Sequence, residues 1–170
     1  MMRKTVTALG LVLCLGTGLP HAQDKNTKES AAERLTRTFE SICLQTLPHL
    51  AGAAERLKAG GFELTPLGDQ EMYELWNESM KMGGHLHLAQ GDRKPACGFL
   101  MEDVKRQEVE PLVEALLADW LGKKPARWET NDPYMAGWQV PAGGSVLYIS
   151  VATSLSDNPT QGASVNVEER

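Results

Sequence analysis

The sequence lacks several features that would assign it to a class of protein at once. It has no apolar run of about 20 residues, the length that a membrane-spanning helix needs. It has no basic stripe, and its formal net charge is -5, so we expect no nucleic-acid partner. It has no cofactor fingerprint, no nucleophile elbow and no complete metal-binding motif. These absences favour a non-enzymatic protein.

What is present indicates a folded chain. Of its 170 residues, 42% are hydrophobic and 23% are charged, which excludes the low-hydrophobicity, high-charge composition of disordered chains. This length supports one sizeable hydrophobic core and is short for two. We therefore expect a single globular domain.

The first 22 residues have the pattern of a secretory signal peptide. Two basic residues, Arg3 and Lys4, precede a short apolar run over residues 6–19 that is broken only by small residues, and residues 20–22 follow it. We expect cleavage after Ala22, with Gly18 as the alternative site. The mature protein would then be soluble and periplasmic or secreted.

Removal of this leader changes the net charge of the protein. The remaining chain has a short polar segment followed by the predicted domain. The remainder has 15 Lys and Arg against 22 Asp and Glu, a net charge of -7. Residues 23–29 are polar throughout and predict a flexible start. Residues 30–170 form the predicted domain.

Two cysteines, Cys43 and Cys97, remain after the leader is removed. An even number of cysteines in an oxidising compartment predicts a disulfide. Closing a loop of this length would contribute about 4 kcal/mol in the loop-entropy model. Free thiols or metal-bound thiolates are the alternatives, although neither cysteine belongs to a Cys-x-x-Cys unit.

Two amphipathic patterns predict a kinked pair of helices near the start of the domain. The first begins near Ser30 and places Cys43 on its apolar side. Pro48 interrupts the pattern. A second, shorter pattern follows and stops at Gly60 and Gly61, which suit a helix end.

A third helix is predicted over residues 109–121, where an apolar stripe is continuous. Pro111 belongs in its first turn, and Gly122 ends it. The stripe includes Trp120, so we expect this tryptophan to be buried.

Residues 69–80 fit two elements. Met72, Leu75, Trp76 and Met80 suit a short helix, whereas residues 72–76 also fit an aromatic strand; we favour the helix. The next segment predicts a β-hairpin, because residues 85–88 alternate and residues 96–102 form another short run. The disulfide would join the first helix to the second strand of this hairpin.

Further strands are predicted over residues 126–130, 137–140 and 145–152, with short turns that make neighbours antiparallel. Residues 145–152 are nearly all apolar, which favours a central strand covered on both faces. Residues 163–167 alternate between apolar and polar, which favours an edge strand. The fold class is α+β, with helices packed on one antiparallel sheet.

The most suggestive string for chemistry contains Met80, Met82, His85 and His87. Two imidazoles two positions apart on a strand point the same way, and thioethers beside them suit Cu(I). The alternative interpretation is that methionines fill the core and the histidines occupy a solvated face. A catalytic histidine is the third possibility.

Aromatic residues around the turn at residues 131–133 predict a binding surface. We expect Trp128, Tyr134 and Trp138 to be partly exposed there, although tryptophans on strands are more often part of the core. Exposed aromatic side chains beside a turn are typical of partner interfaces.

Several short motifs resemble those of a known group of proteins. The chain has, in this order, Phe39-x-x-x-Cys43, Gly61-Phe62 and Ala96-Cys97-Gly98, and a long amphipathic helix follows them. In these the chain resembles small secreted two-cysteine proteins of Gram-negative bacteria, a group without an assigned function. The resemblance implies an exported α+β fold with a disulfide, and it implies no site residues.

These observations lead to three hypotheses. The first is a periplasmic, non-enzymatic protein that binds another protein or a small ligand. The second is copper handling through the Met/His string, and the third is a hydrolase whose site is dispersed through the fold.

Overall fold

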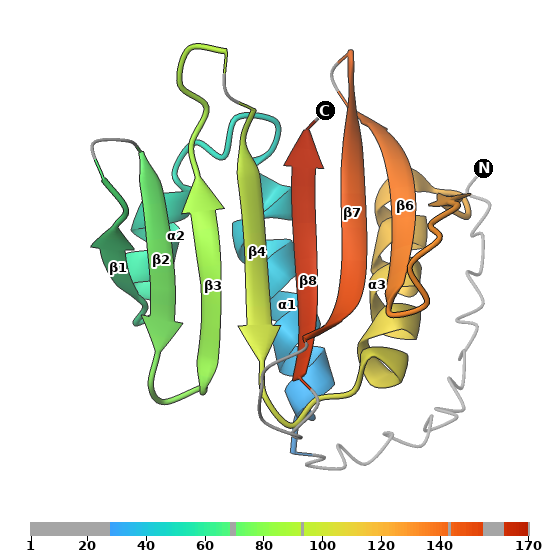
Figure 1. Cartoon of the computed structure of the whole chain (residues 1–170), viewed down its shortest axis with the longest axis horizontal. Coiled ribbons are helices and arrows are strands. Elements are labelled where there is room, and N and C mark those ends of the chain that lie inside the picture. Colours follow the sequence, from blue (N-terminus) through green and yellow to red (C-terminus); the bar gives the residue numbers. More distant parts are fainter. Residues whose placement is uncertain (1–27, 69–70, 93, 143, 155–161, 170) are drawn as a thin grey trace, which may run out of the picture.

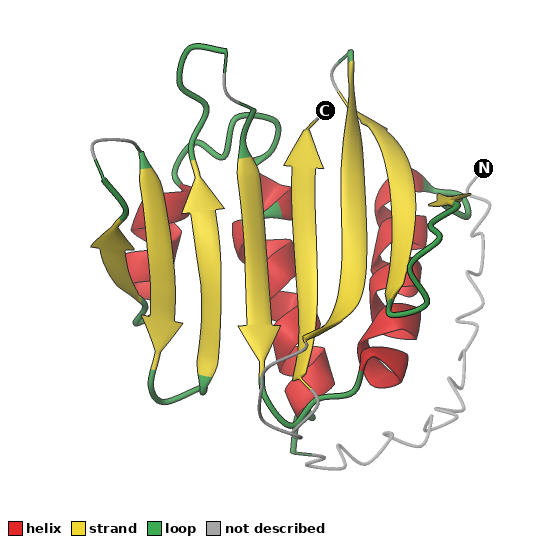
Figure 2. Cartoon of the chain, viewed as in Figure 1, coloured by secondary structure: helices red, strands yellow, loops and turns green. Residues whose placement is uncertain are grey.

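The computed structural model describes residues 28–68, 71–92, 94–142, 144–154 and 162–169. It confirms the α+β class: three helices pack on one face of an eight-stranded antiparallel sheet (Figures 1 and 2). The predicted leader, residues 1–22, lies outside the described residues. None of the described helices is long and apolar enough to cross a membrane.

The elements follow one another with short connections. The helices are α1 (Ala31–Ile42), α2 (Ala53–Ala59) and α3 (Arg106–Leu121), with a 3-10 turn, η1 (Leu44–Thr46), after α1. The strands are β1 (Glu63–Pro66), β2 (Met72–Asn77), β3 (Met82–His87), β4 (Ala96–Met101), β5 (Ala126–Trp128), β6 (Met135–Ala142), β7 (Ser145–Ser154) and β8 (Gly162–Glu169).

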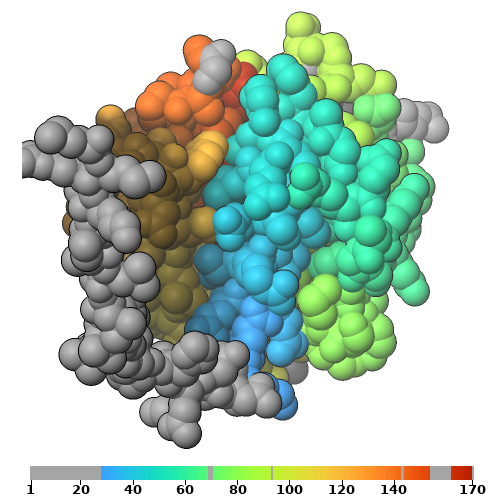
Figure 3. Space-filling model, turned by 180° about the vertical axis from the view of Figure 1, so that it is seen from behind, coloured from blue at the N-terminus to red at the C-terminus, as the bar shows by residue number. Residues whose placement is uncertain are grey.

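The sheet consists of two antiparallel meanders that meet in its middle. Its strand order is β1-β2-β3-β4-β8-β7-β6-β5, so the pairing of β4 with β8 joins the first meander to the second. Helix α1 packs against β4 and β8, α2 against β1, and α3 against β7 and β8. Viewed from the helical side, α1 and α2 lie beside α3 and cover the sheet (Figure 3).

Local sequence signals account for the helix ends. Ser30 and Glu33 form a reciprocal capping box at the start of α1, with N···O distances of 2.7 and 3.1 Å. Gly122 ends α3 in the left-handed conformation, with φ of 65°. The prediction for Trp120 is wrong: its side chain is 44% exposed, because α3 turns Val109, Val113 and Leu117 towards the sheet instead.

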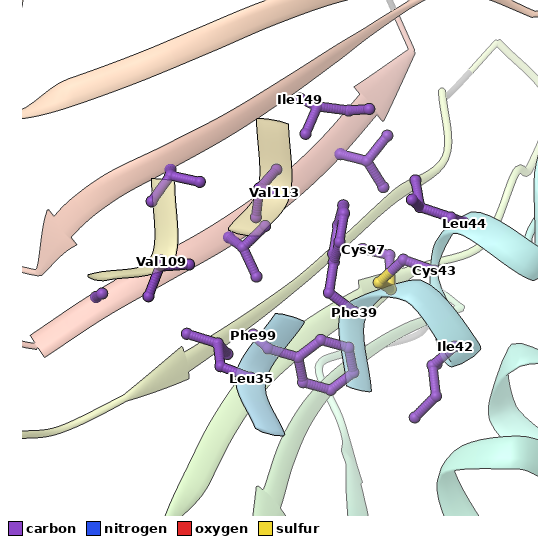
Figure 4. Packing of buried hydrophobic residues seen from close by; sticks show 14 of the residues in the cluster. Leu35, Phe39, Ile42, Cys43, Leu44, Cys97, Phe99, Val109, Val113 and Ile149 are labelled. Carbon is purple, nitrogen blue, oxygen red and sulfur yellow. A yellow bond between two sulfur atoms is a disulfide. The ribbon is translucent and has the colours of Figure 1, made fainter. Parts of the chain in front are cut away.

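The core lies between the helices and the sheet, and the disulfide is part of it (Figure 4). Cys43, the residue that ends α1, is bonded to Cys97 in β4, with a Cα–Cα distance of 5.7 Å, as predicted. Phe39 and Phe99 are buried beside this bond. The disulfide therefore attaches α1 to the middle of the sheet.

The preference for a helix over residues 69–80 is wrong. Residues 72–77 form β2, in which Leu75 and Asn77 are buried while Glu74 and Trp76 are exposed. This burial pattern has the period of a strand. The predicted hairpin over the following residues is confirmed, since β3 pairs with β4 and Leu86 is opposite Cys97.

Two predictions about the last strands are also wrong. Strand β8 is not an edge strand: it lies between β4 and β7 in the middle of the sheet. Strand β7 is covered by helices on one face only, so Val146 is 40% exposed. A central strand in a sheet with one solvated face alternates in the same way as an edge strand, which explains the error for β8. The error for β7 arose because Val146 and Tyr148 are apolar although they lie on the face opposite the helices.

Candidate functional site

The candidate site lies on the face of the sheet opposite α1, α2 and α3, which we call the open face. Paired residues on neighbouring antiparallel strands have their side chains on the same face. One row of paired residues crosses all eight strands on the open face, and we call it the central row. From β1 to β5 it contains Thr65, Glu74, His85, Gly98, Asn166, Ser150, Gly137 and Trp128.

Gly98 lets two polar side chains meet in the middle of this row. A Cβ atom at Gly98 would lie 2.0 Å from Asn166 Oδ1 and 2.8 Å from His85 Cε1. The His85 and Asn166 side chains therefore occupy the space above the Gly98 backbone. Asn166 Nδ2 also donates a hydrogen bond to Ser164 Oγ, at 3.4 Å.

An aromatic ring lies over a second glycine of the central row. A Cβ atom at Gly137 would lie 2.7 Å from Trp128 Cε3, so the indole lies directly over Gly137. Tyr148 contacts the same indole edge to face, with ring centroids 5.6 Å apart. Trp128 and Tyr148 thus form an aromatic wall near one side of the sheet.

A third aromatic side chain lies on the opposite side of the open face. The Trp76 side chain is 42% exposed, and it packs over Gly83. Its indole N–H donates to Glu78 Oε2 at 3.0 Å. This hydrogen bond orients the ring while leaving part of its surface accessible to a ligand.

Two hollows occupy the open face between these aromatic residues. One of about 690 Å³ is bounded in part by Glu74, Trp76 and Leu100. A second of about 330 Å³ is bounded in part by Trp128 and Tyr148. His85 and Asn166 line both hollows, so the two are adjacent.

His85 and His87 lie together on β3, with ring centroids 5.3 Å apart. Burial is the main cause that lowers the pKa of His85, and the neighbouring His87 lowers it further. Glu168 acts in the opposite direction. His85 is therefore neutral at neutral pH and has a ring nitrogen that accepts a hydrogen bond.

The three aromatic residues of the predicted binding surface do not lie together in the structure. Trp138 is fully buried, so the prediction of its exposure is wrong. It pairs with Arg127 and Ile149 on the helical side, whereas Trp128 lies on the open face. Tyr134 is 54% exposed in the turn before β6. Only Trp128 belongs to the central row.

The residues of the Met/His string also lie apart, because the sheet separates Met82 from the two histidines. Met82 is fully buried on the helical side of β3, opposite the face that carries His85 and His87. Met80 is half-buried and packs against the core. Among the described residues, no three His, Cys, Asp or Glu side chains are grouped so that they could hold a metal ion.

Sequence reasoning missed Gly98, Asn166, Glu74 and Trp76 as members of a site. The polar alternation around Asn166 was a usable signal, since it marks a solvated face. That signal does not reveal which residues on other strands lie beside it. The site depends on the strand register, which brings distant segments of the chain into one row.

The chain was also compared with known proteins. No protein-family model, curated protein or solved structure matches it. The functional argument therefore depends on the chain's own residues.

Proposed function

We propose that this chain is an exported, non-enzymatic binding protein whose ligand or partner lies on the open face. The observation that carries the proposal is the pair of adjacent hollows that share His85 and Asn166. Accessible aromatic surface beside polar side chains is typical of binding sites. The open face has both, with Trp76 and Trp128 on opposite sides of His85.

The proposed location rests on two independent features. The signal-peptide pattern of residues 1–22 directs a chain to the export machinery. The disulfide between Cys43 and Cys97 is consistent with an oxidising compartment outside the cytoplasm. Intact mass of the protein recovered from the periplasm tests this: we expect a chain that begins at Gln23 and carries no free thiol. A full-length chain in the cytoplasm would contradict export.

Binding on the open face is tested with a matched pair of tryptophan variants. Trp76 on the open face and Trp120 on α3 are 42% and 44% exposed, so either can be replaced without opening the core. Native mass spectrometry of protein recovered from the periplasm would detect a bound molecule. We expect Trp120→Ala to retain it and Trp76→Ala to lose it. Equal retention by both variants would contradict the proposal.

Copper handling remains a second candidate, because His85 and His87 are adjacent on the open face. Copper would have to bind to these two imidazoles alone, because the thioether of Met82 lies on the other side of the sheet. A competitive Cu(I) titration tests it, with His85→Ala and His87→Ala combined as the variant. Tight binding that this double variant abolishes would favour copper handling over the binding of an organic ligand. Hydrolysis remains a prediction, tested by turnover on a panel of esters, peptides and glycans.

A further inference from the structure

The larger hollow lies beside the central row, at a strand position that carries no side chain. The next row of paired residues on the open face contains Trp76, Gly83, Leu100 and Ser164, and all four line the hollow. A Cβ atom at Gly83 would lie 3.5 Å from Trp76 Cε3, so the indole packs over this glycine. The volume of about 690 Å³ falls within the range of about 300–1,000 Å³ that is typical of small-ligand sites.

Trp76 gives this hollow an accessible aromatic surface that is held in place. The residue is 42% exposed, and its indole N–H donates to Glu78 Oε2 at 3.0 Å. A side chain that is already oriented loses little conformational entropy when a ligand packs on it. Carbon–hydrogen groups gather on one face of a sugar ring, and this flat apolar patch makes close dispersion contact with an indole. Trp76 thus offers a platform for one sugar ring.

The hollow also has polar groups that match the hydroxyl groups of a sugar. Five polar side chains line it: Thr65, Glu74, His85, Ser164 and Asn166. Hydroxyl, amide and neutral imidazole groups each donate and accept hydrogen bonds, as a sugar hydroxyl does. His85 belongs to this set because burial lowers its pKa, which keeps its ring neutral at neutral pH. Ser164 and Asn166 are hydrogen-bonded to each other at 3.4 Å and form one polar side of the hollow.

Glu74 adds a strong acceptor beside the aromatic platform. It is two residues from Trp76 on β2, so both side chains lie on the open face. A carboxylate has about four lone-pair sites and accepts from two neighbouring hydroxyl groups of one sugar ring, in hydrogen bonds about twice as strong as neutral ones. A purely apolar ligand would leave the polar groups of the hollow without such bonds, which costs affinity. The combination favours a saccharide over an apolar molecule.

We propose that the larger hollow binds a saccharide, with one sugar ring on the exposed face of Trp76 and its hydroxyl groups bonded to Glu74 and Asn166. The inference rests on the proposed function and specifies its ligand. His85 and Asn166 also line the second hollow, which continues the site towards Trp128. A second sugar unit therefore has contacts available, and an oligosaccharide binds more tightly than a monosaccharide.

Isothermal titration calorimetry of the purified, disulfide-bonded protein tests the proposal with defined neutral sugars. The probes are maltotetraose, cellotetraose and N-acetylated chitotetraose, and the control is sorbitol, a polyol without a ring. We expect at least one tetrasaccharide to bind with a Kd of about 10 μM to 1 mM. Sorbitol should not bind, because it lacks the apolar face of a sugar ring. No binding of any tetrasaccharide at about 5 mM, or equal binding of sorbitol, would overturn the inference.

Tryptophan variants test the contact with the sugar ring. Trp76→Ala should weaken the binding of the tetrasaccharide at least about tenfold, and Trp120→Ala on α3 should leave it unchanged. Trp76→Phe should retain part of the affinity, because a phenyl ring preserves an aromatic platform. The two tryptophans are similarly exposed, so neither replacement opens the core. Equal affinities of Trp76→Ala and Trp120→Ala would overturn the site.

Glutamate variants test the hydrogen bonds from the sugar hydroxyls. Glu74→Gln keeps the size of the side chain and removes its charge, and Glu55→Gln makes the same change on α2. Both side chains are exposed, so we expect unchanged melting temperatures. We expect Glu74→Gln to weaken the tetrasaccharide about three- to tenfold and Glu55→Gln to weaken it less than about twofold. Equal affinities would overturn the placement of the sugar beside Glu74.

The outcomes separate this inference from the proposed function. If no tetrasaccharide binds, the inference fails. The proposed function would still stand if native mass spectrometry shows that Trp76→Ala loses the molecule that the exported protein retains. A retained molecule whose mass is not that of a saccharide would overturn the inference alone. Failure of both experiments would overturn both conclusions.

Discussion

Cys43 at the end of α1 is bonded to Cys97 in the middle of the sheet, and both side chains are fully buried. The bond closes a segment that includes α2 and β1–β3, all of the first meander outside β4. It therefore restricts the unfolded chain over a long stretch while it contributes to the core.

The disulfide gives the first prediction. Replacing both cysteines, by Cys43→Ala and Cys97→Ala, should lower the free energy of unfolding by about 2–5 kcal/mol, because the unfolded chain gains freedom. Urea unfolding followed by circular dichroism measures this loss. A reductant added to the native protein should reduce the disulfide slowly, because both sulfur atoms are buried. A double variant as stable as the wild type would show that the bond is dispensable.

The second prediction concerns Gly98. Gly98→Ala places a methyl group 2.0 Å from Asn166 Oδ1, so it should destabilise the protein by about 1–3 kcal/mol. Adding Asn166→Ala should restore part of this loss, because the nearest clash is removed. Gly83→Ala is the matched control: its Cβ would be 3.5 Å from Trp76, which is ordinary contact. Urea unfolding should show little change in Gly83→Ala.

The third prediction is the pH dependence that His85 causes. Its pKa in the folded protein lies below the ordinary value of 6.5, so the unfolded chain binds a proton that the folded chain does not. The stability associated with His85 is therefore complete above pH 6.5 and is lost as the pH falls towards the lowered pKa. His85→Gln should make the unfolding free energy less dependent on pH in this range. An unchanged pH dependence would show that His85 is not its source.

The fourth prediction concerns Arg127, which connects β5 to α3. Its guanidinium pairs with Glu110 at 2.9 Å and with Glu114, and it lies 5.5 Å from the ring centroid of Trp138. Its hydrogen bond is the main cause that lowers the pKa of Glu114. Arg127→Met should cost about 1 kcal/mol, because these contacts are partly exposed. Lys123 is exposed, so Lys123→Met serves as the control in urea unfolding. Unfolding curves that coincide for Arg127→Met and Lys123→Met would contradict the prediction.

The helices were predictable because their signals are local. Ser30 and Gly122 mark helix ends within one turn of chain, and the apolar spacing around Phe39 repeats without interruption. The hairpin of β3 and β4 was equally local. The pairing of Cys43 with Cys97 followed from there being two cysteines after the predicted leader.

The errors arose where the answer depended on distant residues. Residues 72–76 have apolar side chains at spacings that fit a helix and a strand, and only pairing with β1 and β3 decides between them. The position of β8 depends on β4, which is far away in the sequence. The burial of Trp138 follows from which face of β6 the helices cover.

The candidate site was the least predictable part for the same reason. Gly98, Asn166 and Trp128 come from three separate strands and share a row only through register. None has a distinctive motif around it. Sequence reasoning found Trp128 and His85 individually, each in a hypothesis that paired it with residues on the other face.

Strand β8 follows the other seven strands in the sequence and yet occupies the middle of the sheet. Before β8 is inserted, β4 and β7 each have an unpaired edge, and the two meanders are not joined by strand pairing. Pairings such as Ala96 with Glu168 close long loops, which makes folding slow and cooperative. The two meanders can therefore be joined by strand pairing only after residues 162–169 have been synthesised.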